Sequence, residues 1–231
     1  NCLNIESKKT LNSKKIRLER GKVISKIFSL SYDEPVAMER SAFQYMFDYE
    51  GNSYLDAYNN VPHVGHCHPV VIEAASKQMK KLNTNTRYLY DIINSYGRKL
   101  LKKFNKSLNR VYFVNSGSEA SDLAIKLALA YSKNKNIMVL KNGYHGHTQR
   151  GTDISAYKFN HVRGQGKKDY VTVVPMPKKK DYENDNSLIN HTIKKVENIA
   201  AFICEPILGC GGQVPLTKNY LKKVYKKIRD N

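Results

Sequence analysis

The residues whose chemistry is easiest to interpret lie at 115–119, where the sequence NSGSE precedes a long apolar repeat. Ser116 is a favoured helix N-cap residue, and Glu119 three positions later completes a capping box. A helix that begins here leaves backbone N–H groups exposed at its positive end, and Gly117 lets a ligand approach the backbone closely. The segment therefore predicts a phosphate-binding position, although an ordinary, well-capped connection between a strand and a helix explains the same residues.

Two further segments carry residues suited to a planar ligand. Segment 141–148, KNGYHGHT, places Tyr144 among glycines and histidines, and its ring could either lie against a planar ligand or pack internally. In segment 205–213, EPILGCGGQ, Glu205 directly follows an apolar run, where a carboxylate needs a partner such as a ligand, a metal or an arginine. Together with the phosphate-binding position, these residues suggest a phosphorylated aromatic cofactor.

Alternating strands and helices are expected to position these segments. The run 111–114 predicts a buried strand, and the apolar repeat at 120–131 predicts a helix with a wide buried face. The sequence also predicts strands at 137–140, 170–174 and 200–204, and helices at 71–82, 92–104, 187–196 and 217–229. This order is typical of an α/β fold with a mainly parallel sheet, helices on both faces and ligands at the carboxyl ends of the strands.

The N-terminal part has a different character and predicts a small α+β segment. Residues 1–34 are polar and basic, which indicates an arm or a short helix. Alternating apolar and polar residues at 36–58 predict two strands joined by a turn at Glu50-Gly51-Asn52, a β-hairpin. We therefore expect an N-terminal arm and hairpin at 1–62 and a larger domain at 63–231.

The histidine-rich segment 59–69, NNVPHVGHCHP, raises the question of a metal site. His66, Cys67 and His68 are adjacent, so in an extended loop their side chains point in alternating directions, and no second ligand cluster occurs elsewhere in the sequence. Histidines that pack in the loop or face a substrate are the favoured interpretation, and we predict no metal.

Composition narrows the possible partners and the compartment. The 231 residues carry 39 lysines and arginines against 20 acidic residues, a net charge of +19, which suggests nucleic-acid binding. The lysines are spread along the whole chain, as expected for solvated helix faces, so we predict no nucleic-acid partner. No run of about 18 apolar residues and no signal-peptide pattern occurs, which favours a cytoplasmic protein without a membrane partner. The four cysteines form no C-x-x-C pair and are interpreted as thiols.

Several motifs, taken in order, resemble one enzyme family. NSGSEASDLAIKLA, then GYHGHT and then ICEP are similar to the class III aminotransferases, which are pyridoxal-phosphate (PLP) enzymes of fold type I. YLDAYNNVPHVGHCHP, LNTNTRYLYD and ISAYKF most resemble the subgroup of alanine–glyoxylate aminotransferase-like proteins and the ethanolamine-phosphate and phosphohydroxylysine phospho-lyases. The resemblance extends from about Tyr32 to the end, and it implies that 63–231 is the first part of the large PLP-binding domain.

The resemblance implies roles for particular residues. Gly117 and Ser118 would bind the PLP phosphate, Tyr144 would stack on the pyridine ring, and Glu205 would lie near the ring and help to order the site. Asn59, Asn60 and Val61 would lie on the substrate side. The implied reaction moves an amino group from an amine or amino acid to a keto acid, with PLP as the electron sink, in a homodimer.

Two departures from the family pattern affect this interpretation. Many members carry a second acidic residue in the loop after Glu-Pro, where this chain has Cys210, a change that favours a phospho-lyase acting on a phosphorylated amine. The Asp-Glu motif and the Schiff-base lysine of the family would both follow Asn231. We therefore expect an N-terminal fragment, inactive alone, that contains no catalytic residue; a truncated, non-catalytic homologue is the alternative.

Overall fold

The computed structural model describes residues 13–58, 63–177, 197–216 and 219–230. It divides into two compact units, one extending to Ile92 and the other beginning at Ile93. The predicted helix at 187–196 lies outside the described residues, and the predicted domains 1–62 and 63–231 stay a prediction.

The first unit is built around a small antiparallel sheet with the strand order β1-β2-β3. Its elements are α1 (Ser13–Val23), β1 (Met38–Ala42), β2 (Tyr45–Asp48), β3 (Ser53–Leu55) and α2 (Pro69–Lys81). The prediction of two strands was wrong, because Phe43 adopts a left-handed conformation with φ of 48° and reverses the chain between β1 and β2. The turn at Glu50-Gly51-Asn52 is confirmed, and it joins β2 to β3.

The second unit contains most of α3 and all the later elements. They are α3 (Asp91–Leu101), α4 (Gly117–Ser132), β4 (Asn136–Leu140), α5 (Gln149–Asp153), the 3-10 turn η1 (Ala156–Lys158), β5 (Val171–Val174), β6 (Ile199–Ile203), β7 (Ile207–Leu208), β8 (Val214–Pro215) and α7 (Tyr220–Arg229). The predicted helices at 92–104 and 217–229 and the three predicted strands after residue 136 are thus confirmed within a few residues.

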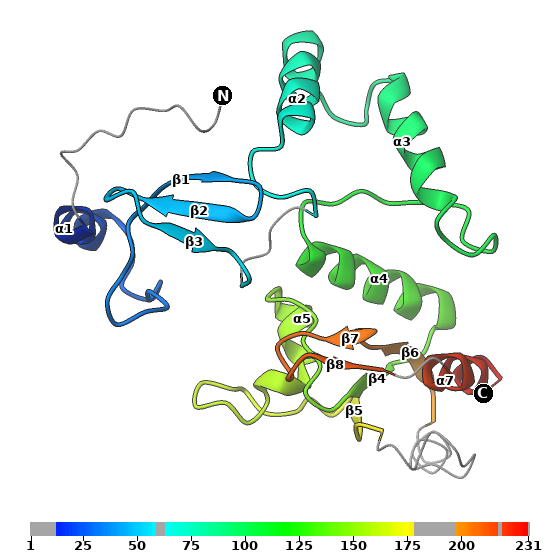
Figure 1. The fold of residues 1–231 in the computed structure, drawn as a ribbon. Helices are drawn as coiled ribbons and strands as arrows, with labels where there is room; N and C mark the ends of the chain where they lie inside the picture. Colours follow the sequence, from blue (N-terminus) through cyan, green and yellow to red (C-terminus); the bar gives the residue numbers. More distant parts are fainter. Residues whose placement is uncertain (1–12, 59–62, 178–196, 217–218, 231) are drawn as a thin grey trace. The chain divides into compact units, whose positions relative to one another are not determined.

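Strands β5, β4 and β6 form a parallel sheet with β4 in the centre. The side chains of β4 are apolar on both faces because both faces are covered. Ile137 and Val139 pack with Ile125 of α4 in one buried cluster. Met138 and Leu140 pack in a second cluster, to which α7 contributes residues. Helices therefore cover both faces, as predicted for an α/β fold (Figure 1).

The predicted strand at 111–114 is not formed. No ladder of the described residues includes this segment, and the side chains of Tyr112, Phe113 and Val114 are exposed. A β-branched and aromatic run becomes a strand only where a neighbouring strand supplies hydrogen-bond partners, and none in the described part of the chain does so. Phe113 instead stacks on Tyr96 of α3, with ring centroids 5.2 Å apart.

Two general expectations can be compared with the described residues. Cys67, Cys204 and Cys210 are free thiols, as predicted. Among the helices that the structure describes, none combines the length and the apolar character that crossing a lipid bilayer requires.

Candidate functional site

The N-terminus of α4 is capped as the sequence predicts. Ser116 Oγ accepts a hydrogen bond of 3.1 Å from the backbone N–H of Glu119. The Glu119 carboxylate accepts one of 2.8 Å from Asn115 N–H, one residue before the cap. Gly117 and Ser118 occupy the first two helical positions, whose N–H groups have no acceptor within the helix. A Cβ added to Gly117 would meet no atom within 4 Å, so space for an anion lies beside these N–H groups.

The loop after β4 lies directly on this helix terminus. His147 donates its backbone N–H to Ser118 Oγ over 3.1 Å, and His147 Nδ1 lies 3.0 Å from the same oxygen. A Cβ on Gly146 would lie 2.7 Å from Ser118 Cα, and the φ of Gly146 is +106°. Sequence reasoning assigned no role to His147, because its partner is 29 positions away and no local pattern connects the two residues.

Glu205 joins the same loop to the loop that follows β6. Its Oε2 accepts a hydrogen bond of 2.8 Å from Tyr144 N–H, and its Oε1 accepts one of 3.1 Å from Gly209 N–H. Two backbone amides thus stabilise the carboxylate, where the sequence suggested a ligand, a metal or an arginine. Glu205 therefore fixes the backbone of Tyr144 at the carboxyl edge of the sheet.

His145 lies in the interior beneath this loop. Its backbone N–H donates to Ser155 Oγ over 2.8 Å, and that hydroxyl donates to Gly151 O over 2.6 Å. Burial lowers the pKa of the imidazole, and the Glu205 charge opposes this effect, so the ring is neutral at pH 7. Its Nε2 is buried and has no hydrogen-bond partner among the described residues. A buried polar atom without a partner indicates a position where a polar group is accommodated.

Cys204 precedes Glu205 but is unsuited to nucleophilic chemistry. Burial raises the pKa of its thiol to about 11, and the Glu205 charge acts in the same direction, against a weak contact with Tyr225 Oη. The thiol is therefore protonated at neutral pH, and a protonated thiol is a poor nucleophile.

These contacts bring four of the predicted site residues into one network. Ser118 and Gly117 begin α4, Tyr144 follows β4, and Glu205 follows β6. The open space at Gly117 fits the phosphate group of a ligand at the start of α4. The predicted substrate-side residues Asn59, Asn60 and Val61 lie outside the described residues.

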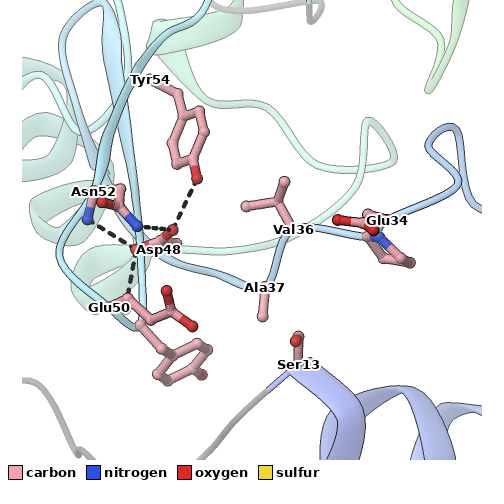
Figure 2. Close-up of a pocket in the computed structure, with 10 residues that line it drawn as sticks. Ser13, Glu34, Val36, Ala37, Asp48, Glu50, Asn52 and Tyr54 are labelled. Carbon is pink, nitrogen blue, oxygen red and sulfur yellow. Dashed lines mark hydrogen bonds between the residues drawn. The ribbon is translucent and has the colours of Figure 1, made fainter.

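A pocket of about 360 Å³ in the first unit has a structural explanation (Figure 2). It surrounds Asp48, whose carboxylate accepts hydrogen bonds from the backbone N–H of Glu50 and Asn52, from the Asn52 amide and from Tyr54 Oη. The Asn52 amide is the largest cause that lowers the pKa of Asp48. These bonds fix the β2–β3 turn and leave the carboxylate fully occupied.

The histidine-rich segment makes local contacts in its described part. His66 Nε2 lies 2.7 Å from Asp56 Oδ2, and the backbone of His66 pairs with that of Phe43. His68 is the N-cap residue of α2. No three potential metal-ligating side chains gather within the residues that the structure describes.

Comparison with known proteins places this chain in a family. Residues 28–231 match the model of the class III aminotransferases. The chain is 37% identical to an alanine–glyoxylate aminotransferase 2-like protein of Drosophila melanogaster, over 98% of this chain and 50% of that protein. It is 34% identical to ethanolamine-phosphate phospho-lyase homolog 1 of Caenorhabditis elegans, over 96% of this chain and 53% of that protein.

The fold is shared with solved structures. A phospholyase from Arthrobacter in complex with phosphoethanolamine has a TM-score of 0.80 and 28% identity, with 93% of this chain and 53% of that chain covered. This chain thus spans about half the length of the relatives that it matches. Because the family model matches far more than half of its residues, this chain belongs to the class III aminotransferases, a family of PLP-dependent enzymes.

Proposed function

We propose that this chain forms the cofactor-binding part of a PLP-dependent aminotransferase that moves an amino group from an amine or amino acid to a keto acid. The observation that carries the proposal is the connection of three loops at one edge of the sheet. Ser118 bonds to His147 in the middle loop, and Glu205 bonds to Tyr144 in the same loop. The loop after β4 thereby connects the start of α4, whose N–H groups would bind the phosphate, to the aromatic side chain of Tyr144.

In this proposal, each residue performs a binding or positioning task. The N–H groups of Gly117 and Ser118 hold the cofactor phosphate, and Tyr144 offers its ring to the cofactor ring. Glu205 positions Tyr144 through its backbone, and neutral His145 supports the loop from the interior. PLP supplies an electron sink for the amino-transfer reaction. The Schiff-base lysine of the family is not assigned to any lysine of this chain.

A phospho-lyase that acts on a phosphorylated amine is the second candidate. It is supported by the names of two relatives and by Cys210, which stands where many aminotransferases carry an acidic residue. Without that carboxylate, an arginine that binds dicarboxylate keto acids lacks its usual counter-charge.

We further propose that the protein is a cytoplasmic homodimer and that Asn59, Asn60 and Val61 lie on the substrate side. Light scattering on the PLP-loaded, full-length protein tests the dimer, and a monomer at micromolar concentration would contradict it.

Two assays on the full-length protein separate the candidate reactions. Keto-acid consumption in the presence of amino donors is expected for an aminotransferase, and release of inorganic phosphate from O-phosphoethanolamine is expected for a phospho-lyase. Phosphate release that does not depend on any keto acid would overturn the aminotransferase proposal. Absence of both activities in PLP-saturated protein would favour a non-catalytic homologue.

A further inference from the structure

A cavity of about 430 Å³ opens beside Tyr144 in the second unit. Tyr144, Gly146 and His147 of the loop after β4 line one part of it, and residues of the segment 158–166 line another part. The cavity therefore borders the same loop that holds Ser118 and Glu205. A substrate group that enters it would lie next to the ring of the proposed cofactor site.

The lining of this cavity has an excess of positive charge. Lys158 and Arg163 contribute cations, and His161 lies between them in the sequence. Asp153 is the one acidic residue in the described lining, and its carboxylate is already engaged. Its Oδ1 accepts a hydrogen bond of 2.9 Å from Gln149 Nε2, and its Oδ2 accepts one of 2.9 Å from Tyr170 Oη.

The cations of the cavity lack acidic partners within the described part of the chain. No described hydrogen bond or ion pair involves the side chain of Arg163 or that of His161. Lys158 Nζ lies 5.0 Å from the centroid of the Tyr157 ring, and no described carboxylate lies within ion-pair distance of it. An anion bound in the cavity would be attracted by both cations.

The segment that carries these cations is held in place by the core and by a tight turn. Phe159 is buried in the cluster that contains Ile137 and Val139. The N–H of Gly164 donates to His161 O over 2.6 Å, and a Cβ on Gly164 would overlap the carbonyl oxygens of Lys158 and Phe159. The cations are therefore presented by an ordered backbone, which lowers the entropic cost of binding an anion.

A hydrogen bond connects this segment to the loop that carries Tyr144. The backbone N–H of Tyr157 donates to Gly143 O over 3.1 Å, directly before Tyr144. Lys158 thus directly follows Tyr157, whose backbone is hydrogen-bonded to the loop after β4.

We propose that this cavity binds the phosphate group of a phosphorylated amine substrate, with Lys158 and Arg163 as the phosphate ligands. The inference rests on the second candidate function, the phospho-lyase, because only that reaction uses a phosphorylated amine that must reach a cofactor beside Tyr144. A phosphomonoester carries close to two negative charges at pH 7, which matches two cations, whereas a carboxylate carries one. Arginine binds phosphate oxygens through paired N–H groups, and lysine adds a compact charge.

The test uses the PLP-loaded, full-length protein and the variants K158M and R163M. K222M and R229M on α7 are matched controls, because each removes the same charge outside the cavity. Calorimetry measures the binding of O-phosphoethanolamine, ethanolamine and inorganic phosphate. K158M and R163M are expected to weaken O-phosphoethanolamine and phosphate binding about tenfold to a hundredfold, and the controls to leave it unchanged. Ethanolamine binding and PLP retention after dialysis are expected to stay as in the unmodified protein.

Three results would overturn the inference. Unchanged O-phosphoethanolamine affinity in both variants, or no measurable affinity in the unmodified protein, would exclude these residues as ligands. Loss of PLP from the variants would assign the cavity to the cofactor phosphate instead. Failure of the phospho-lyase candidate is recognised separately, by the absence of phosphate release from O-phosphoethanolamine in the unmodified protein, and the binding measurement on the variants still decides whether Lys158 and Arg163 hold the phosphate group.

Discussion

At the scale of single residues, Glu205 has a more precise role than its charge alone suggests. Its two oxygens accept hydrogen bonds from Tyr144 N–H and Gly209 N–H, so the carboxylate connects two loops. In Glu205→Gln, the side-chain NH₂ group replaces one carboxylate oxygen and cannot accept a hydrogen bond. One of the two bonds to Tyr144 N–H and Gly209 N–H is therefore lost. We expect a stability loss of about 2 kcal/mol and weaker PLP retention, measured by urea unfolding and by absorbance after dialysis. The exposed Glu73→Gln is the control, and equal behaviour of the two variants would contradict this role.

His145 gives the protein a pH dependence with a definite sign. Burial lowers the pKa of the folded imidazole below the ordinary value of 6.5, so the unfolded state binds the proton first as the pH falls. The His145 contribution to stability is therefore unaffected above about pH 6.5 and decreases below it, by up to about 1.4 kcal/mol per pH unit. Melting temperatures from pH 5 to 8 are expected to show a shallower acid slope in His145→Gln than in the unmodified protein. An equal slope in His145→Gln would contradict the assignment.

At the scale of elements, the contact between the loop after β4 and the first turn of α4 depends on Gly146. Gly146→Ala combines a strained positive φ with an overlap against Ser118 Cα, and we expect it to cost about 2–4 kcal/mol and to reduce PLP retention. Gly212→Ala separates the two effects, because Gly212 has a φ of +116° but a Cβ there would approach no described atom closer than 3.8 Å. If both variants lose the same stability by urea unfolding, the overlap is not the cause.

The elements also show which features the sequence could predict. The cap of α4 and the strands β4, β5 and β6 were predictable, because capping residues and apolar runs act over a few positions. The turn at Phe43 was not, because an aromatic residue with positive φ has no sequence signature. The contact of His147 with Ser118 and that of Glu205 with Tyr144 were also beyond prediction, because 29 and 61 positions separate the bonded residues. The strand predicted at 111–114 was wrong for a related reason. Its composition favours a strand, but no strand among the described residues pairs with it.

At the scale of the whole molecule, large apolar side chains remain exposed in the described part of the second unit. Tyr131 of α4 is 92% exposed, and the segment 112–114 adds three more apolar side chains. Exposed large apolar side chains favour association. Residues 1–231 expressed alone are therefore expected to self-associate, as measured by light scattering over a range of protein concentrations. A monodisperse preparation of residues 1–231 would contradict this expectation.

The hydrogen bonds that connect the described segments of the candidate site all involve the loop after β4. Ser118 and Glu205 each bond to that loop, and no described hydrogen bond joins them to each other. A substitution of Ser118 or of Glu205 therefore removes one connection and keeps the other, whereas a substitution that displaces the loop after β4 removes both connections. Variation is expected to be tolerated unequally along the chain, and a library of substitutions would find the fewest functional replacements between Gly143 and His147.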